Sequence, residues 1–514
     1  MNSDQANLAD RFKRLKDKVL EKRPTLQSLL IKRGDKKLLD YANEYVDVNL
    51  PPTIPFRQAE LLEVMEAHIT RRFGLEVAES AIAQLKEFYF VSTADHTGPL
   101  THPFFVNSNL LTAASLVSHD KANLNNVIVL SCANIAYNNS SFPRGLFFHN
   151  YIDGHVGLHR LPFLSAKPTP HSIYAMNPYK IDDVKKVYSL MKDEVNAGKI
   201  LPDQYEKICA LLKEIYENQE VLECKSYCEQ VGKTNFKLWN KFFEASNVQL
   251  PNLVYLEQET LVVDLLTKYH LHQDTILNHM LFDPRYEPFI NNYFEDIFGS
   301  FSRKDSTGTY LFWALPAGSR ENLQLWRKGN YLVSKDESYK IELNPEAIGE
   351  AMARKELIPG LLLNFCTLSF YYGLKCLGGF NQINYLTLMK NNYIKMNADL
   401  GNYRSIEICA RAQTREMNDG LSVAFMEYGN ETKELTLASG LDLILYGNKN
   451  SWSAIMDIMK NITLEEAFNP VLPEIYPITY DKKEWEPDLI SITEKDVSNL
   501  TELNKKIKPC IVMN

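Results

Sequence analysis

The sequence predicts an α/β protein built on a mixed or mostly parallel sheet, with a large helical N-terminal region and a helical insertion. Two short apolar runs, residues 88–93 and 125–134, are rich in aromatic or β-branched residues and end in polar turns, as buried strands do. The segment between them, residues 109–124, has the composition of a helix. Strand, helix and strand in this order are typical of a parallel α/β unit.

Four regions are expected along the 514 residues, because one ordinary core does not accommodate a chain of this length. Residues 1–87 form a helical N-terminal region, since apolar residues recur there at helical spacing. Residues 88–180 hold the strand–helix–strand unit and the candidate site. Residues 181–247 are charged and amphipathic, which predicts a helical insertion. Residues 248–514 form a C-terminal α/β or α+β region.

Short apolar runs predict further strands in this last region. They are residues 253–259, 309–316, 330–334, 338–343, 405–413, 421–429 and 441–447. Helices are expected over residues 260–271 and 344–396. The most apolar stretch, residues 357–377, contains Pro359, Asn364 and Lys375, so we expect a buried helix there and no membrane span.

The composition narrows the classes of partner. Hydrophobic residues make up 45% of the chain and charged residues 23%, as in globular proteins. The net charge of −8 disfavours a nucleic-acid or membrane-surface binder. The first fifteen residues lack the apolar segment of a secretion signal, and the eight cysteines are scattered, as in a reducing compartment. We therefore expect a cytoplasmic protein with a small-molecule substrate, no nucleic-acid partner and no membrane contact, and leave its oligomeric state open.

The first candidate cluster directly follows the first predicted strand. It runs from residue 93 to 103 and offers Asp95, His96 and His102 as catalytic groups, with the hydroxyl groups of Thr93 and Thr97 for substrate binding. An aspartate can orient a histidine that acts as a general base, or the two can bind a metal. The alternative interpretation is a tight turn whose polar side chains pair with the backbone.

The second cluster follows the second predicted strand, between residues 134 and 145. Asn138 and Asn139 supply neutral donors and acceptors, and Arg144 can hold a carboxylate or phosphate through two hydrogen bonds. We expect these three residues to bind substrate. An ordinary polar loop is the alternative. In parallel α/β units, ligands bind beyond the carboxyl ends of the strands, and both clusters fall there.

The third cluster is a glycine-rich run of histidine and aspartate. Asp153, His155 and His159 lie within seven residues, together with two glycines that disfavour a helix. Joined by His96, they form the expected ligand set of a divalent metal, zinc or manganese, with an open position for water. Histidines that are hydrogen-bonded and metal-free are the alternative.

Two segments of these clusters resemble the opening of creatininase-type metal-dependent amidohydrolases. The resemblance covers about sixty residues, STADHTGPLTHP and then VIVLSCANIAYNNSSFPRG. His96 matches the histidine of that family's first turn, and Phe142 with Pro143 stands where its Phe-Pro does. Ala94 stands where the family has an acidic ligand, and Asn107 or Asn109 falls near the position of a ligating aspartate. The resemblance implies metal-dependent hydrolysis of a C–N bond.

No phosphate-binding glycine loop or serine-hydrolase elbow appears in the sequence. We therefore interpret the chain as an intracellular metabolic enzyme, a hydrolase before a transferase. It would act on a small polar or anionic metabolite by metal- or histidine-assisted hydrolysis of a C–N bond. One alternative is a metal-independent transferase or biosynthetic enzyme that uses Asp95 and His96 as acid and base. The other is a non-enzymatic interaction protein.

Overall fold

The computed structural model describes residues 3–119, 121–165, 171–319, 321–429 and 434–513. Its centre is a parallel four-stranded sheet in the order β13-β1-β2-β5. The strands are β1 (Phe90–Ser92), β2 (Asn126–Ser131), β5 (Asn252–Glu257) and β13 (Lys375–Leu377). The predicted α/β fold with a parallel core is confirmed.

The strand order creates a topological switch beside β1. The chain passes from β1 to β2 to β5 in one direction, and then returns to the other side of β1 with β13. In open parallel sheets, ligand sites form beyond the carboxyl ends of the strands near such a reversal. The carboxyl edge of this sheet is therefore the first place to look for a functional site.

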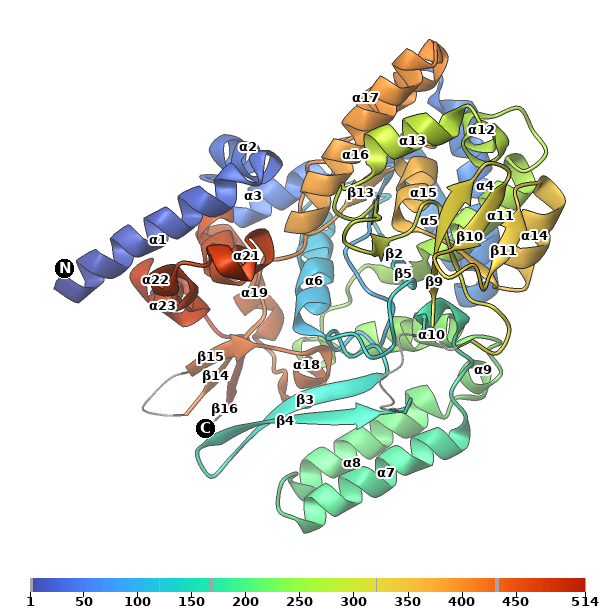
Figure 1. The fold of residues 1–514 in the computed structure, drawn as a ribbon. Coiled ribbons are helices and arrows are strands. Elements are labelled where there is room, and N and C mark those ends of the chain that lie inside the picture. Colours follow the sequence, from blue (N-terminus) through green and yellow to red (C-terminus); the bar gives the residue numbers. More distant parts are fainter. Residues whose placement is uncertain (1–2, 120, 166–170, 320, 430–433, 514) are drawn as a thin grey trace.

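Helices cover both faces of the central sheet, as Figure 1 shows. Successive residues of a strand point to opposite faces, so Val129 belongs to one hydrophobic cluster and Ile128 to the other. The first cluster includes α6 (Pro103–Ser118), which connects β1 to β2 and is buried along nearly its whole length. Pro103 begins this helix at a position where proline costs no hydrogen bond.

The helical N-terminal region contributes to both faces. Its helices are α1 (Ser3–Glu21), α2 (Pro24–Arg33), α3 (Leu38–Ala42), α4 (Ile54–Phe73) and α5 (Leu75–Glu87). The first three pack into the cluster on the α6 side, whereas α4 and α5 pack on the opposite face. The break between the two groups falls at a proline-rich segment, residues 51–55.

In the described part of the chain, an antiparallel hairpin and four α-helices lie between β2 and β5. The hairpin consists of β3 (Gly145–Ile152) and β4 (His155–Pro162), and Figure 1 shows it extending from the body with α7 and α8 alongside. The helices are α7 (Ile181–Asn196), α8 (Pro202–Leu211), α9 (Gln219–Leu222) and α10 (Tyr227–Trp239). They bear out the predicted helical character of this segment, and α10 packs on β5.

The rest of the chain adds a five-stranded sheet, a two-stranded hairpin, a three-stranded sheet and many helices. An antiparallel sheet holds β8 (Phe312–Ala314), β9 (Leu323–Lys328), β10 (Tyr331–Ser334), β11 (Lys340–Glu342) and β12 (Leu357–Pro359). A short hairpin pairs β6 (Phe301–Ser302) with β7 (Thr307–Gly308). A third sheet holds β14 (Phe425–Tyr428), β15 (Glu434–Leu437) and β16 (Ile511–Met513).

The helices of this part fall into two groups. Those before β14 are α11 (Gln258–Tyr269), α12 (Ile276–Phe282), α13 (Tyr286–Phe294), α14 (Pro345–Ala353), α15 (Leu361–Phe365), α16 (Phe380–Asp399) and α17 (Ile406–Arg411). Those after it are α18 (Gly440–Tyr446), α19 (Ser451–Asn461), α20 (Leu464–Phe468), α21 (Leu472–Thr479), α22 (Pro487–Ile490), α23 (Glu494–Leu500) and α24 (Leu503–Lys506). Within the described ranges, no helix has both the length and the apolar character needed to cross a membrane.

Three local predictions were wrong. Residues 405–413 and 441–447 were expected to form strands, but they contain α17 and α18. Short apolar runs fit a buried helix as well as a buried strand, and tertiary packing decides between them. Residues 357–377 were expected to form one buried helix. They contain β12, α15, the π-helix η5 (Cys366–Tyr371) and the central strand β13.

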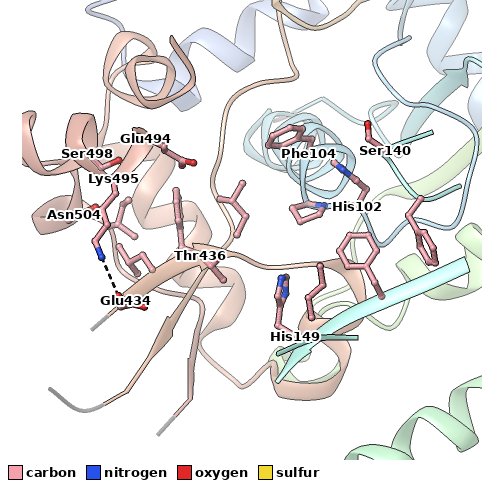
Figure 2. A pocket seen from close by; sticks show the side chains of 18 of the residues that line it. His102, Phe104, Ser140, His149, Glu434, Thr436, Glu494, Lys495, Ser498 and Asn504 are labelled. Carbon is pink, nitrogen blue, oxygen red and sulfur yellow. Dashed lines mark hydrogen bonds and ion pairs between the residues drawn. The ribbon is translucent and has the colours of Figure 1, made fainter. Parts of the chain in front are cut away.

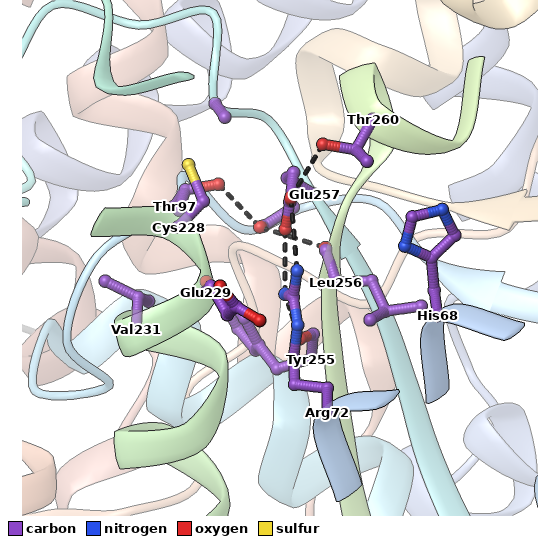
Figure 3. Close-up of polar contacts among 12 residues, drawn as sticks. His68, Arg72, Thr97, Cys228, Glu229, Val231, Tyr255, Leu256, Glu257 and Thr260 are labelled. Carbon is purple, nitrogen blue, oxygen red and sulfur yellow. Dashed lines mark hydrogen bonds and ion pairs between the residues drawn. The ribbon is translucent and has the colours of Figure 1, made fainter. Parts of the chain in front are cut away.

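A buried ion pair anchors the carboxyl end of β5 (Figure 3). Arg72, in the last turn of α4, donates to Glu257 through Nη1 at 2.8 Å and Nη2 at 3.2 Å. Both side chains are almost fully buried, with exposed fractions of 1% and 5%. Thr260 donates a further hydrogen bond to Glu257. The guanidinium lowers the pKa of Glu257 to about 2 against the opposing effect of burial, so this carboxylate is ionised and paired.

Candidate functional site

The hydroxyl groups of the two threonines in the first cluster form hydrogen bonds to other parts of the protein. The hydroxyl of Thr93 donates to the carbonyl of Leu377 at 2.9 Å and accepts from the side chain of Gln382 at 2.6 Å. The hydroxyl of Thr97 lies 2.6 Å from that of Ser131. These contacts tie β1 to β13 and the β1 loop to β2. Both threonines, predicted to bind substrate, therefore hold the carboxyl edge together in this structure.

Asp95 is fully buried beneath α6. Its carboxyl group accepts hydrogen bonds from Asn109 at 2.9 Å and from Ser108 at 3.3 Å. Burial raises the pKa of Asp95 to about 8, the hydrogen bond from Asn109 opposes that rise, and the nearby Asp419 carboxyl adds to it. Asp95 is enclosed, and its carboxyl group is neutral at pH 7. It is therefore better suited to hold the loop in place than to accept a proton from a substrate.

Replacing Asp95 with asparagine tests this protonation state. Because the folded-state pKa of about 8 exceeds the ordinary 3.8, the folded protein keeps a proton that the unfolded chain releases. The stabilisation is complete below about pH 4 and is lost as the pH rises to about 8. We expect the free energy of unfolding of D95N, relative to wild type, to grow from pH 5 to 8 by up to about 1.4 kcal/mol per pH unit.

The measurement is urea-induced unfolding at fixed pH values, followed by tryptophan fluorescence. D10N, which changes an exposed carboxylate, serves as the matched control and should run parallel to wild type. Parallel curves for D95N as well would show that the Asp95 carboxyl is ionised in the folded protein.

His96 and His102 lie close together as neutral imidazoles. His96 forms an isolated parallel bridge with Cys132 beyond the end of β1, and its ring packs 5.5 Å from the ring of Phe105. Burial lowers the pKa of both histidines, that of His102 to about 4 with a smaller contribution from His96. The Nδ1 atom of each ring is buried and has no hydrogen-bond partner among the described residues.

The second loop packs directly on the first, as predicted from their positions at the sheet edge. A Cβ on Gly98 would lie 2.7 Å from the Cα of Pro143, so only glycine allows this approach. From α10, Tyr227 donates to the carbonyl of Pro143 at 2.7 Å, and the amide of Asn235 bonds to Gly98 and Leu100. Helix α10 therefore holds both loops together.

The amide side chains of the second loop differ in their surroundings. Asn138 is exposed. Asn139 accepts hydrogen bonds from the backbone and hydroxyl of Ser141, and it also bonds to His96, which partly offsets the lowering of that histidine's pKa by burial. Of the two asparagines, Asn139 is the one in contact with a predicted catalytic residue.

Arg144 and Arg160 lie against the ring of Phe142. Their guanidinium carbons are 4.9 and 5.8 Å from its centre. Burial lowers the pKa of Arg144, and the charge of Arg160 adds to the effect. Within the described ranges, neither arginine makes an ion pair, and Nη1 of Arg144 is buried without a partner. Two adjacent guanidinium groups with no carboxylate partner are suited to bind an anion.

The predicted metal ligands are not brought together. Asp153 and His155 are exposed at the turn of the β3–β4 hairpin. His159 stacks on Phe148, and its Nδ1 lies 3.8 Å from the carboxylate of Glu194. In the part of the chain that the structure describes, no group of three or more His, Cys, Asp and Glu side chains is arranged to hold a metal ion. The divalent metal stays a prediction.

A histidine–aspartate pair that the sequence does not reveal lies beside these loops. His149 on β3 places its Nδ1 2.7 Å from one carboxylate oxygen of Asp442, and its backbone N–H donates to the other at 2.7 Å. Asp442, on α18, is fully buried and also accepts from the backbone of Ser439 at 2.8 Å. Tyr446 donates to the carbonyl of His149 at 2.8 Å. The imidazole is held firmly in one orientation.

His149 and His102 line one cavity of about 650 Å³, shown in Figure 2. One wall is apolar and consists of Phe104, Phe142, Phe147 and Leu158. Ser140 and Arg160 add polar groups to the same side. The opposite wall comes from β15, α23 and α24, where Lys495 pairs with Glu434 at 3.1 Å. The volume suits a small metabolite.

The N-terminus of α6 also faces this cavity, since His102, Pro103 and Phe104 line it. In the described structure, no side chain caps this helix and no acidic residue lies in its first turn. The backbone N–H groups of a first turn are unpaired within the helix and favour negative charge. The cavity therefore combines an oriented histidine, a helix N-terminus and a guanidinium group.

No protein-family model matches the chain, and no curated protein is significantly similar to it. The resemblance to creatininase-type amidohydrolases rests on the quoted residues alone. His96 and Phe142 do lie on contacting loops, but the geometry that points to chemistry is centred on His149.

Proposed function

We propose that this protein is an enzyme that hydrolyses the C–N bond of a small metabolite carrying an anionic group and an apolar side chain. The observation that carries the proposal is the His149–Asp442 pair beside the cavity. His149 Nδ1 is bound to a buried carboxylate, so Nε2 carries the free lone pair, and His149 lines a space of metabolite size.

In the proposed reaction, His149 acts as general base. Its Nε2 takes a proton from water as the water oxygen attacks the amide carbon, and Asp442 stabilises the imidazolium that forms. When the C–N bond breaks, the electron pair goes to nitrogen, and His149 returns the proton to that leaving amine. The products are a carboxylate and an amine.

The other groups of the cavity support binding and charge stabilisation. The first-turn N–H groups of α6 suit the oxygen that becomes negative during attack. The guanidinium groups of Arg160 and Arg144, which both lie against the ring of Phe142, are suited to bind the anionic group of the substrate. Phe104, Phe147 and the other apolar residues of the same wall suit its side chain. Asp95 and His96 would then shape the loop behind His102.

N-Acetyl-L-phenylalanine and N-acetyl-L-leucine have this combination of groups and are the probes for the test. We expect the purified protein to release free amine from at least one of them, measured by fluorescamine, and to do so in the presence of EDTA. Activity lost in EDTA and restored by zinc or manganese would favour the metal-assisted route. Binding of both compounds without release of amine would contradict hydrolysis and favour a transferase or a binding protein.

The arginine pair allows a prediction about substrate binding. Replacing Arg160 with glutamine removes the exposed guanidinium and leaves His149 untouched. We expect KM for the anionic substrate to rise by about ten- to a hundredfold, because one charge-assisted hydrogen bond contributes about 1.5 to 3 kcal/mol, with little change in kcat. R285Q, which alters an exposed arginine paired with Asp283, is the control. If kcat of R160Q fell by the same factor as KM was expected to rise, Arg160 would instead take part in the chemical step.

A further inference from the structure

A second cavity, of about 260 Å³, lies between α16 and the segment that follows α17. In the described structure, it shares no lining residue with the His149 cavity. Three cationic side chains line it: Lys390 on α16, Arg411 at the end of α17, and Arg415 four residues further on. The chain as a whole carries a net charge of −8, so this local excess of positive charge runs against the overall balance and attracts anions.

Hydrogen bonds fix the walls of this cavity. The hydroxyl of Thr387 on α16 lies 2.9 Å from that of Thr414, and both residues are buried. The side chain of Gln413 accepts from the backbone N–H of Asn49 at 3.0 Å and donates to the carbonyl of Asp47 at 3.1 Å. These contacts hold α16, the segment after α17 and the residues before α4 together without using either arginine.

Lys390 is a half-buried cation without a carboxylate partner among the described residues. Its Nζ donates to the carbonyls of Ala410 at 2.9 Å and Ala412 at 2.7 Å. An ammonium group has three N–H donors, so one remains for a ligand in the cavity. Neutral carbonyls do not cancel the charge of a partly desolvated cation. An anion in the cavity would supply the counter-charge that Lys390 lacks.

The two arginines are free to bind a ligand. Both are exposed, and among the described residues neither guanidinium group makes a hydrogen bond or an ion pair. Burial lowers the pKa of Lys390, the charge of Arg415 adds to this effect, and Cys409 and Glu416 oppose it. Arg415 therefore acts on the same small space as Lys390. Guanidinium groups bind phosphate oxygens through pairs of parallel hydrogen bonds.

The charge and polarity of the cavity select the kind of anion. Glu416 is the one carboxylate among its described lining residues, and it also interacts electrostatically with Lys375 and Arg33. Three positive charges against one negative charge leave two positive charges in excess. A phosphate monoester carries a charge of about −1.5 to −2 at pH 7, which matches this excess better than a single carboxylate does. The lining has no aromatic side chain, so it offers no apolar wall of the kind found in the His149 cavity.

We propose that the cavity between α16 and the segment after α17 binds a phosphate group, with Lys390, Arg411 and Arg415 as its ligands. The group comes either from a small phosphorylated metabolite or from inorganic phosphate, and the test distinguishes these two sources. A space of about 260 Å³ holds a phosphate with a short polar substituent. This site is separate from the proposed hydrolytic cavity and does not depend on it.

The test measures phosphate binding to the full chain by titration calorimetry and thermal melting at low ionic strength. The ligands are glycerol 3-phosphate, ribose 5-phosphate and inorganic phosphate, and the controls are glycerol, ribose and the dicarboxylate succinate. We expect at least one phosphate compound to bind with a Kd below about 1 mM and to raise the melting temperature. We expect all three controls to bind at least about tenfold more weakly.

The order of affinities identifies the source of the phosphate. Tighter binding of an ester supports a metabolite, and tighter binding of inorganic phosphate supports the free ion. Succinate binding as tight as that of the phosphate compounds would overturn the proposal, as would no binding of any phosphate compound up to about 50 mM.

Single substitutions locate the bound phosphate. R411Q and R415Q should each lower phosphate affinity by about tenfold, since each removes a charge-assisted hydrogen bond. Both arginines are exposed, so the ligand-free melting temperature should stay close to that of wild type. R404Q, which changes an exposed arginine outside the cavity, is the matched control. R160Q should also keep wild-type phosphate affinity, because Arg160 lines the His149 cavity. Wild-type affinity in both R411Q and R415Q, or loss of affinity in R160Q alone, would overturn the proposal.

Discussion

Replacing His149 with glutamine is expected to reduce kcat by about 10²- to 10⁴-fold, which is the usual contribution of a positioned general base. Glutamine has a similar length and can still donate to Asp442, but it carries no basic nitrogen. Because the binding groups on α6 and at Arg160 remain, we expect KM to change little. The measurement is steady-state amine release from the best N-acetyl amino acid, together with circular dichroism to confirm folding.

Replacing Asp442 with asparagine tests the second member of the histidine–aspartate pair. Asparagine keeps the shape but cannot stabilise an imidazolium or fix the proton on Nδ1 of His149, so kcat should again fall by at least about 10²-fold. Part of the effect will be structural, because Asp442 also accepts from the backbone of His149 and Ser439. We therefore expect D442N to lower the melting temperature, whereas H149Q should preserve it.

A matched control exists elsewhere in the chain. His279 lies 2.6 Å from Asp274, but this pair is on the surface and outside the cavity. H279Q should retain wild-type kcat and KM. If folded H149Q also turned over substrate at the wild-type rate, His149 would be only a tie between β3 and α18, and the proposed mechanism would be wrong.

Breaking the buried ion pair between Arg72 and Glu257 is expected to give the largest loss of stability. Removing one partner leaves an uncompensated charge in a region with almost no solvent contact. Such changes cost about 3 to 5 kcal/mol of the free energy of unfolding. R72M leaves the carboxylate of Glu257 unpaired, and E257Q leaves the guanidinium of Arg72 without its counter-charge. Urea-induced unfolding measures both.

A double variant distinguishes the effect of losing the ion pair from the effect of leaving one buried charge unpaired. R72M/E257L removes both charges and fills the space with apolar atoms, so it should recover most of the lost stability, since buried ion pairs and apolar replacements of similar volume are often equivalent.

Gly232 supports the same geometry, because a Cβ there would lie 2.7 Å from Cδ of Arg72, and G232A should destabilise the protein as well. E337Q, in the exposed pair with Lys328, should cost less than about 1 kcal/mol. A loss equally small in E257Q would show that Glu257 is not a buried, paired carboxylate.

The elements that were predicted correctly have strong local signals. β1, β2 and β5 are apolar runs that end in polar turns. The helix between β1 and β2 was expected over residues 109–124, but α6 begins six residues earlier, at Pro103, and ends at Ser118. β13 was missed because it has only three residues, one of them Lys375, and lies inside a longer apolar stretch. α18 was mistaken for a strand, although Ser439 and Asp442 form a capping box before its apolar residues, a signal that could have identified the helix.

The candidate site was predicted in part for the same reason. The loops that follow β1 and β2 meet because the carboxyl ends of parallel strands lie at one edge, and the contact of Gly98 with Pro143 bears this out. Arg144 was predicted as an anion contact, but Arg160 was not considered, because nothing in the sequence places it on the same aromatic ring. The proposed ligand set of His96 and His155 assumed that the hairpin folds back on the sheet, whereas its turn is exposed.

The sequence by itself determined the α/β class, most of the central strands and the edge of the sheet where polar loops gather. These features depend on residues near one another in the chain, whose hydrophobic pattern and turn chemistry act locally. Only the tertiary structure decided that His149 meets Asp442 across 293 positions, that Arg72 pairs with Glu257, and that β13 completes the sheet. These contacts join segments far apart in sequence, and their partners are selected by the packing of whole elements rather than by any local pattern.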